Sequence, residues 1–124
     1  MTDTSQNVLE GMQIRPLDGA ADGVPLVIEP NGDATEQTLA SWLGQNREAV
    51  LGQLHQRGAL LFRGFAIDQP EAFERVVLAL DPDLKDEYLG TSPRDGLTQY
   101  VFTASALPGW YPIPQHCEMS FLPT

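Results

Sequence analysis

A histidine and a glutamate stand two positions apart near the end of this 124-residue sequence, in the stretch YPIPQHCEMSF, where they are His116 and Glu118. Alternate side chains of an extended strand share a face, so both would point one way and Cys117 the other. One imidazole and one carboxylate on a face suit chelation, and two histidines with one carboxylate form the triad of non-haem Fe(II) oxygenases. We therefore predict that His116 and Glu118 lie within about 4 Å of each other and bind a metal.

The spacing alone leaves plainer interpretations open. With 17 acidic residues in the chain, a His-x-acid pair often arises by chance, and a solvated His–Glu pair needs no metal. Cys117 as a nucleophile would lack a base on its own face, which favours a buried small apolar residue. A structural zinc site built from His55, His116 and Cys117 would lack a fourth ligand and any usual spacing.

Three other polar residues are candidates for a structural or a functional role. His55 lies near the end of a predicted helix, where an imidazole interacts favourably with the helix dipole, so we expect a structural role. Arg63 and Arg94 are candidate contacts for a carboxylate substrate, although Arg63 follows an apolar run and pairing with one of the many acids would explain it equally well.

Hydrophobic periodicity predicts two helices. The first helical pattern runs through residues 35–58, with Asp33 and Glu36 as a capping box and a stop at Gly58. We expect a break at Gly44 between a short helix and a longer one. The second follows Asp68 as its cap and has Pro70 in its first turn. Its apolar stripe should pack on a sheet, and consists of Phe73, Val76, Val77 and Leu80.

Three segments read as strands. The run ALLF at 59–62 is continuously apolar and predicts a central strand buried on both faces. VPLVIEP at 24–30 predicts a short edge strand, and LTQYVFTAS at 97–105 predicts a further strand. Residues 1–24 are polar and punctuated by glycine and alanine, so we expect a loosely ordered arm there.

Composition limits the class of protein. A hydrophobic content of 42% is that of one ordinary globular domain, and a net charge of −10 disfavours nucleic acid and anionic membranes as partners. The single cysteine excludes an internal disulfide, and the N-terminus lacks the pattern of a signal peptide. We expect a soluble, cytoplasmic protein.

The order of several motifs resembles the taurine dioxygenase/TfdA-like family of Fe(II)- and 2-oxoglutarate-dependent oxygenases, particularly its clavaminate synthase and asparagine oxygenase relatives. The resemblance covers residues 25–124, and the segment before residue 25 matches nothing. Its most specific parts are GALLFRGF and IPQHCEMSF, with SPRDG between them. It implies an α+β fold that is the N-terminal part of a double-stranded β-helix, or jelly roll, with flanking helices.

The same resemblance implies a mechanism and a gap. His116 and Glu118 would be the first two ligands of Fe(II), with 2-oxoglutarate and O2 as cosubstrates, in an enzyme that hydroxylates an amino-acid-like molecule or a secondary metabolite. The family's distal histidine, its 2-oxoglutarate-binding arginine and its GG-x-T segment come later in the chain and have no counterpart here. No cofactor-binding residue beyond the two ligands is therefore predicted.

We accordingly expect residues 25–124 to be the incomplete N-terminal portion of a dioxygenase domain, inactive in isolation. A homo-oligomer or a complementing C-terminal chain would then supply the rest. Two alternatives remain open at this point, a metal-free binding or scaffold module and a catalytically inactive fragment.

Overall fold

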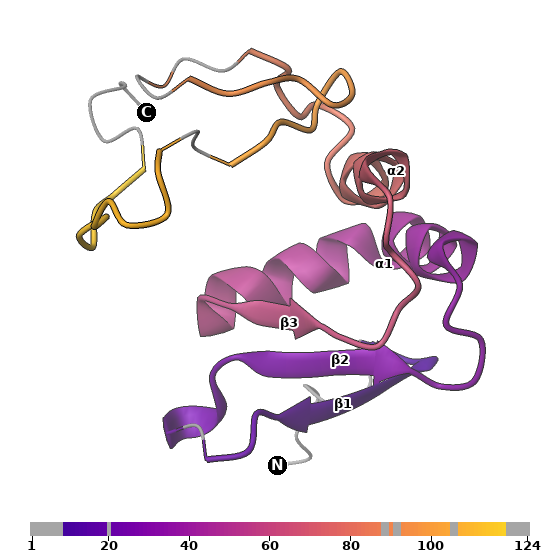
Figure 1. The fold of residues 1–124 in the computed structure, drawn as a ribbon. Helices are drawn as coiled ribbons and strands as arrows, with labels where there is room; N and C mark the ends of the chain where they lie inside the picture. Colours follow the sequence, from indigo (N-terminus) through magenta and orange to yellow (C-terminus); the bar gives the residue numbers. More distant parts are fainter. Residues whose placement is uncertain (1–8, 20, 88–89, 91–92, 105–106, 119–124) are drawn as a thin grey trace.

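The computed structural model describes residues 9–19, 21–87, 90, 93–104 and 107–118, which form an α+β arrangement (Figure 1). A small sheet is covered by one helix and a second helix lies on the first. The described residues after the second helix form no further helix or named strand. The elements in chain order are β1 (Met12–Pro16), the 3-10 turn η1 (Ala21–Gly23), β2 (Leu26–Pro30), α1 (Glu36–Arg57), β3 (Leu60–Phe62) and α2 (Pro70–Leu80).

The sheet has the order β1-β2-β3, with β1 antiparallel and β3 parallel to β2. Our assignment of the two apolar runs was therefore wrong, because β2 is the central strand and β3 lies beside it. Val27 and Ile28 of β2 have no exposed surface, whereas the residues of β3 are only half-buried. Ladder bonds on both edges of β2 account for this difference, since within the described residues β3 pairs on one edge alone.

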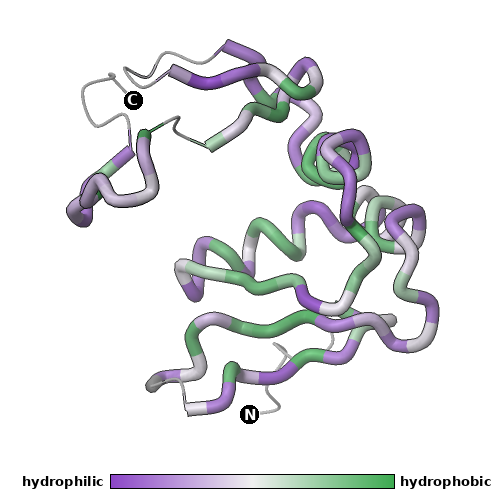
Figure 2. The backbone as a smooth tube through the Cα atoms, in the orientation of Figure 1, coloured by the Kyte–Doolittle hydropathy of each residue, from purple (hydrophilic) through white to green (hydrophobic). Residues whose placement is uncertain are grey.

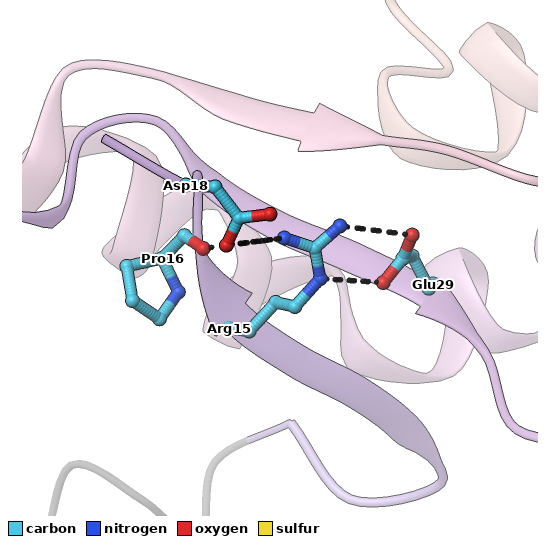
Figure 3. A network of polar contacts seen from close by, with 4 residues as sticks. All are labelled: Arg15, Pro16, Asp18 and Glu29. Atoms are coloured by element: carbon cyan, nitrogen blue, oxygen red, sulfur yellow. Dashed lines mark hydrogen bonds and ion pairs between the residues drawn. The ribbon is translucent and has the colours of Figure 1, made fainter. Parts of the chain in front are cut away.

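The N-terminal residues were predicted to form a loosely ordered arm, and this prediction is wrong for the residues that form β1. Met12–Pro16 pairs along its whole length with β2, and Leu9 just before it is buried. Figure 3 shows the polar contact that reinforces this pairing. The Arg15 guanidinium donates Nε to Oε2 of Glu29 at 2.9 Å and Nη2 to Oε1 at 3.3 Å, and it also meets the Asp18 carboxylate at 3.5 Å.

The N-cap of helix α1 lies two residues after Asp33, the predicted N-cap. Thr35 is the N-cap, and its hydroxyl accepts a hydrogen bond from the Thr38 amide at 3.2 Å. The Asp33 carboxylate accepts instead from the Thr35 amide at 3.0 Å, so it fixes the cap rather than being the cap. The predicted stop at Gly58 is confirmed, because this residue has a φ of 83° and its amide donates to the Leu54 carbonyl at 2.7 Å.

The predicted break at Gly44 is a kink at Asn46 within one helix of 22 residues. Asn46 has φ −114° and ψ 17°, and its side-chain amide donates to the Trp42 carbonyl at 2.9 Å. That carbonyl is the acceptor that the Asn46 backbone amide would use in a regular helix. The side chain thus competes with the helical hydrogen bond and bends the helix without ending it.

The core lies between α1 and β2. Three residues of α1, Leu39, Leu43 and Val50, are almost fully buried in one cluster with Ile28. Figure 2 shows this as hydrophobic backbone colouring on α1 and along β2. Trp42 closes one side of the cluster, because its indole nitrogen donates to the Glu10 carbonyl at 2.7 Å and its ring meets Phe62 edge-on at 6.4 Å.

Helix α2 packs against α1 and not, as predicted, against the sheet (Figure 1). Ala72 and Val76 are its buried residues, while Phe73 is 50% exposed. Its N-cap is Gln69 without a side-chain hydrogen bond, so the predicted cap at Asp68 is wrong, although Pro70 does occupy the first turn. The stripe fails as a sheet contact because α1 already covers the core side of β2.

Helix α2 is also held by charged groups. Arg75 Nε donates to Glu36 Oε1 at 2.5 Å and Arg75 Nη2 to Oε2 at 2.8 Å, which ties the first turn of α1 to the middle of α2. Arg47 Nε donates to the Leu80 carbonyl at the end of α2 at 2.7 Å. No helix in the described part of the chain combines the length and the apolar character that crossing a membrane requires.

Replacing Val76 by Asp should destabilise the protein by about 3 kcal/mol or more, because an unpaired charge would enter the α1–α2 contact. The matched control is Phe73→Asp on the same helix, which should change the stability by less than about 1 kcal/mol because Phe73 is half exposed. Chemical denaturation monitored by circular dichroism compares the two. Equal losses would contradict the observed orientation of α2.

The Glu36–Arg75 pair should make stability depend on pH. Its hydrogen bond with Arg75 holds the pKa of Glu36 below the ordinary value of 4.5. The charged pair therefore stabilises the folded state above about pH 4.5, and this contribution disappears as pH falls through the folded-state pKa. Melting temperatures from pH 7 to pH 3 should show wild type above Glu36→Gln at neutral pH and the two converging in acid. A difference that stays constant down to pH 3 would contradict this role.

Candidate metal-binding site

His116 and Glu118 contact each other in a segment without regular secondary structure. His116 Nε2 lies 3.3 Å from Glu118 Oε2, and the two side chains are 57% and 59% exposed. The predicted proximity is therefore confirmed, in residues 107–118, which form no regular strand. Prolines at 108, 112 and 114 explain the irregular backbone, because each removes an amide donor that a ladder would need.

The ring of His116 is oriented by a backbone group. Its Nδ1 lies 2.9 Å from the Pro114 carbonyl, which can only accept a hydrogen bond, so Nδ1 carries a proton. This bond, followed by the contact with Glu118, raises the pKa of His116 above its ordinary value. In the neutral ring the lone pair of Nε2 would face a carboxylate oxygen. Either a second proton or a cation between the two atoms relieves that repulsion.

The separation of the two atoms suits a shared metal ion. Bond lengths of about 2.1 Å, typical of imidazole and carboxylate ligands to tetrahedral zinc, place neighbouring ligand atoms about 3.4 Å apart. The observed 3.3 Å between Nε2 and Oε2 is close to that value. Within the described residues, no group of three or more His, Cys, Asp and Glu side chains converges. The geometry therefore offers two ligands and no closed site, and it does not bring His55 to His116 and Cys117.

A third charged residue reaches the same carboxylate. Arg94 Nη2 lies 3.8 Å from Glu118 Oε1, the oxygen that does not face His116, and the Arg94 side chain is 28% exposed. Sequence reasoning considered Arg94 only as a substrate contact and could not place it at Glu118, because the two are far apart in the chain. Arg63 is exposed just after β3, and its amide donates to the Ile28 carbonyl at 3.0 Å.

The segment predicted as a strand at 97–105 is a tight turn in its described part. The Thr103 amide donates to the Asp95 carbonyl at 2.8 Å, the Leu97 amide donates to the Val101 carbonyl at 2.8 Å, and a single bridge pairs Gly96 with Phe102. The residue types of LTQYVFTAS favour a strand, but hydrogen bonds between residues four to eight positions apart close the chain on itself.

Glu74 of α2 anchors this turn. Its carboxylate accepts hydrogen bonds from the Thr98 hydroxyl and from the Tyr100 amide, the latter at 2.8 Å. These bonds hold the pKa of Glu74 below its ordinary value, with Thr98 the larger cause. No feature of the sequence singled out Glu74, which reads as an ordinary polar residue on an amphipathic helix.

The chain leading to the site is exposed. Trp110 is 81% exposed, Tyr111 52% and Ile113 58%. Trp110 and Tyr111 are therefore not part of the packed core. Cys117 is exposed as well, which corrects its assignment as a buried small residue.

Because its thiol is exposed, Cys117 should react with a disulfide reagent such as DTNB as completely in the folded protein as in denaturant. One equivalent of thiolate product should be released in both cases. Cys117→Ser should release none. Labelling that requires denaturant would restore the buried assignment.

Comparison with known proteins places the chain in a family. The profile of the taurine catabolism dioxygenase TauD, TfdA family matches residues 13–124, so the match begins earlier than the expected residue 25 and includes most of β1. A clavaminate synthase-like protein of Arabidopsis thaliana is 40% identical over 67 residues, which are 54% of this chain and 20% of that protein.

The dapdiamide synthesis protein DdaC of Enterobacter agglomerans is 30% identical over 108 residues, 87% of this chain and 31% of that protein. The chain thus spans between a fifth and a third of the length of these curated relatives. With a family profile matched along almost its whole length, and with His116 and Glu118 inside that match, the chain belongs to the taurine catabolism dioxygenase TauD, TfdA family.

Proposed function

We propose that this chain contributes two iron ligands, His116 Nε2 and the Glu118 carboxylate, to an Fe(II)- and 2-oxoglutarate-dependent oxygenase. The observation that carries the proposal is the 3.3 Å approach of Nε2 to Oε2 in a chain of a dioxygenase family. The Pro114 carbonyl supports it, because a ligating histidine usually donates its other ring nitrogen to a carbonyl or carboxylate.

Bound Fe(II), together with 2-oxoglutarate and O2, would supply the oxidising chemistry for an unactivated C–H bond. The residues of this chain have narrower tasks. His116 presents a neutral nitrogen whose ring orientation is set by Pro114, and Glu118 supplies a negative charge that offsets part of the charge of the ion. Both side chains are more than half exposed, so other parts of the enzyme must exclude water from the reaction.

A third protein ligand and a cation for the far carboxylate of 2-oxoglutarate would come from outside the described residues. A further segment of a longer polypeptide, a second copy or a complementing chain would serve equally. We propose that the sheet, α1 and α2 form the N-terminal part of a jelly roll with flanking helices. The family match from residue 13 and the pairing of β1 with β2 support including β1 in that domain.

We propose a small molecule as the substrate, either amino-acid-like or a secondary metabolite. One relative is named for dapdiamide synthesis and the other for its likeness to clavaminate synthase. The negative net charge of the chain agrees with this class, because it disfavours a nucleic-acid substrate.

Cobalt(II) titration tests the two ligands. Wild type should develop the visible absorption of a Co(II)–imidazole site with weak affinity, because two protein ligands hold a metal poorly. His116→Ala and Glu118→Ala should lose it. His55→Ala is the matched control and should retain it, since His55 lies at the end of α1. A response that survives His116→Ala, or an absent response in wild type, would contradict the assignment and favour a metal-free binding module.

Turnover tests the reaction. The 124-residue chain with Fe(II), ascorbate and O2 should form no more succinate from 2-oxoglutarate than its His116→Ala variant does. A polypeptide that also supplies the rest of the family domain should form succinate. There His116→Ala should reduce activity by more than the roughly 10- to 100-fold typical of losing an outer-shell partner. Succinate from the short chain, abolished by His116→Ala, would show that its site is complete.

A further inference from the structure

We infer that Arg94 is a positioning residue for Glu118, and that α2 holds Arg94 in place through the turn at residues 95–103. This inference rests on the proposed function, because it concerns the carboxylate assigned there to the metal. It adds a residue that acts on a ligand rather than on the metal or the substrate.

The two oxygens of Glu118 have different partners. Arg94 Nη2 lies 3.8 Å from Oε1, and His116 Nε2 lies 3.3 Å from Oε2. At this distance the guanidinium forms an ion pair with Oε1 and not a hydrogen bond, and its attraction favours the orientation in which Oε2 faces the histidine. Ligating carboxylates commonly have such an outer partner, which orients them and affects metal affinity.

The position of Arg94 is set by the turn that follows it. The Asp95 amide donates to the Thr103 hydroxyl at 2.9 Å, and the Thr103 amide returns a bond to the Asp95 carbonyl at 2.8 Å. These two bonds close the base of the turn directly beside Arg94. The guanidinium therefore extends from a constrained backbone rather than from a free loop.

The tip of the same turn is fixed to a helix. Glu74 accepts from the Thr98 hydroxyl and from the Tyr100 amide, and α2 itself is bound to α1 through Arg75 and Glu36. A continuous series of contacts thus runs from the packed helices to the carboxylate of Glu118. These contacts restrain the exposed segment that carries Glu118, whose own backbone forms no strand hydrogen bonds that would hold it in place.

Charge repulsion and positioning by Arg94 predict opposite changes in metal affinity when the residue is neutralised, so one experiment distinguishes them. A guanidinium near a bound dication repels it, so neutralising Arg94 without any positioning effect should tighten metal binding. If Arg94 orients Glu118, neutralisation should weaken binding, because the carboxylate is free to turn away. The sign of the change distinguishes the two roles.

The test is Co(II) titration of Arg94→Gln, Arg94→Lys and wild type, followed by visible absorbance. We expect Arg94→Gln to weaken Co(II) binding by about tenfold, as loss of an outer-shell partner typically does, and Arg94→Lys to give an intermediate affinity. Arg63→Gln is the matched control, because this exposed arginine follows β3, and it should bind Co(II) as wild type does. Melting temperatures of all variants establish that they are folded.

A double-mutant cycle with Glu118→Asp, which shortens the side chain and keeps the carboxylate as a ligand, isolates the pair through the remaining Co(II) affinity. In the Glu118→Asp background, Arg94→Gln should weaken Co(II) binding less than it does in wild type. If wild type binds Co(II) and His116→Ala abolishes the binding, the iron assignment stands. Unchanged or tighter Co(II) binding by Arg94→Gln would then overturn the role of Arg94 alone. No Co(II) binding by wild type would overturn the iron assignment, and the role of Arg94 with it.

Discussion

Enclosure of β2 is the constraint on which the rest of the structure depends. Val27 and Ile28 have no exposed surface, which requires neighbours on both edges of the strand and a helix over the face of Ile28. β1 and β3 supply the edges, and α1 must be long enough to place Leu39 at one end and Val50 at the other over the same strand. Helix α2 then has α1 as its packing surface, and Glu74 on α2 is where the exposed C-terminal part is attached.

Local features of the fold were predictable because their causes are local. The helix stop at Gly58 follows from one left-handed residue, and Pro70 marks the first turn of α2 by its fixed φ. The central position of β2 was not predictable in this way. VPLVIEP and ALLF are similarly apolar, and which of them lies in the middle depends on whether residues 12–16 form a partner strand. The pairing of β1 with β2 joins distant residues, and the periodicity of neither apolar run predicts it.

In the candidate site, too, the local contact was predictable from the sequence and the long-range contact was not. The approach of His116 to Glu118 was predictable because two side chains separated by one residue meet whenever the backbone is extended, with or without a ladder. The contact of Arg94 with Glu118 depends on how the turn after Arg94 is closed and on its attachment to Glu74. Those contacts join residues that are far apart in the chain, so they cannot be predicted from the spacing of residues in the sequence. The exposure of Cys117 was missed for a related reason, since burial was inferred from the residue type and from the lack of a base on its own face.

The two tryptophans of this chain occupy opposite surroundings. Trp42 is 8% exposed, hydrogen-bonded to a carbonyl and in contact with Phe62, whereas Trp110 is 81% exposed and precedes the candidate site. Intrinsic fluorescence therefore contains two separable signals. A soluble quencher such as acrylamide should reach Trp110 and largely spare Trp42, so the unquenched emission reports on the packed helices and the quenchable emission on the segment that leads to His116. The protein carries its own pair of optical probes, one for each of its differently organised parts.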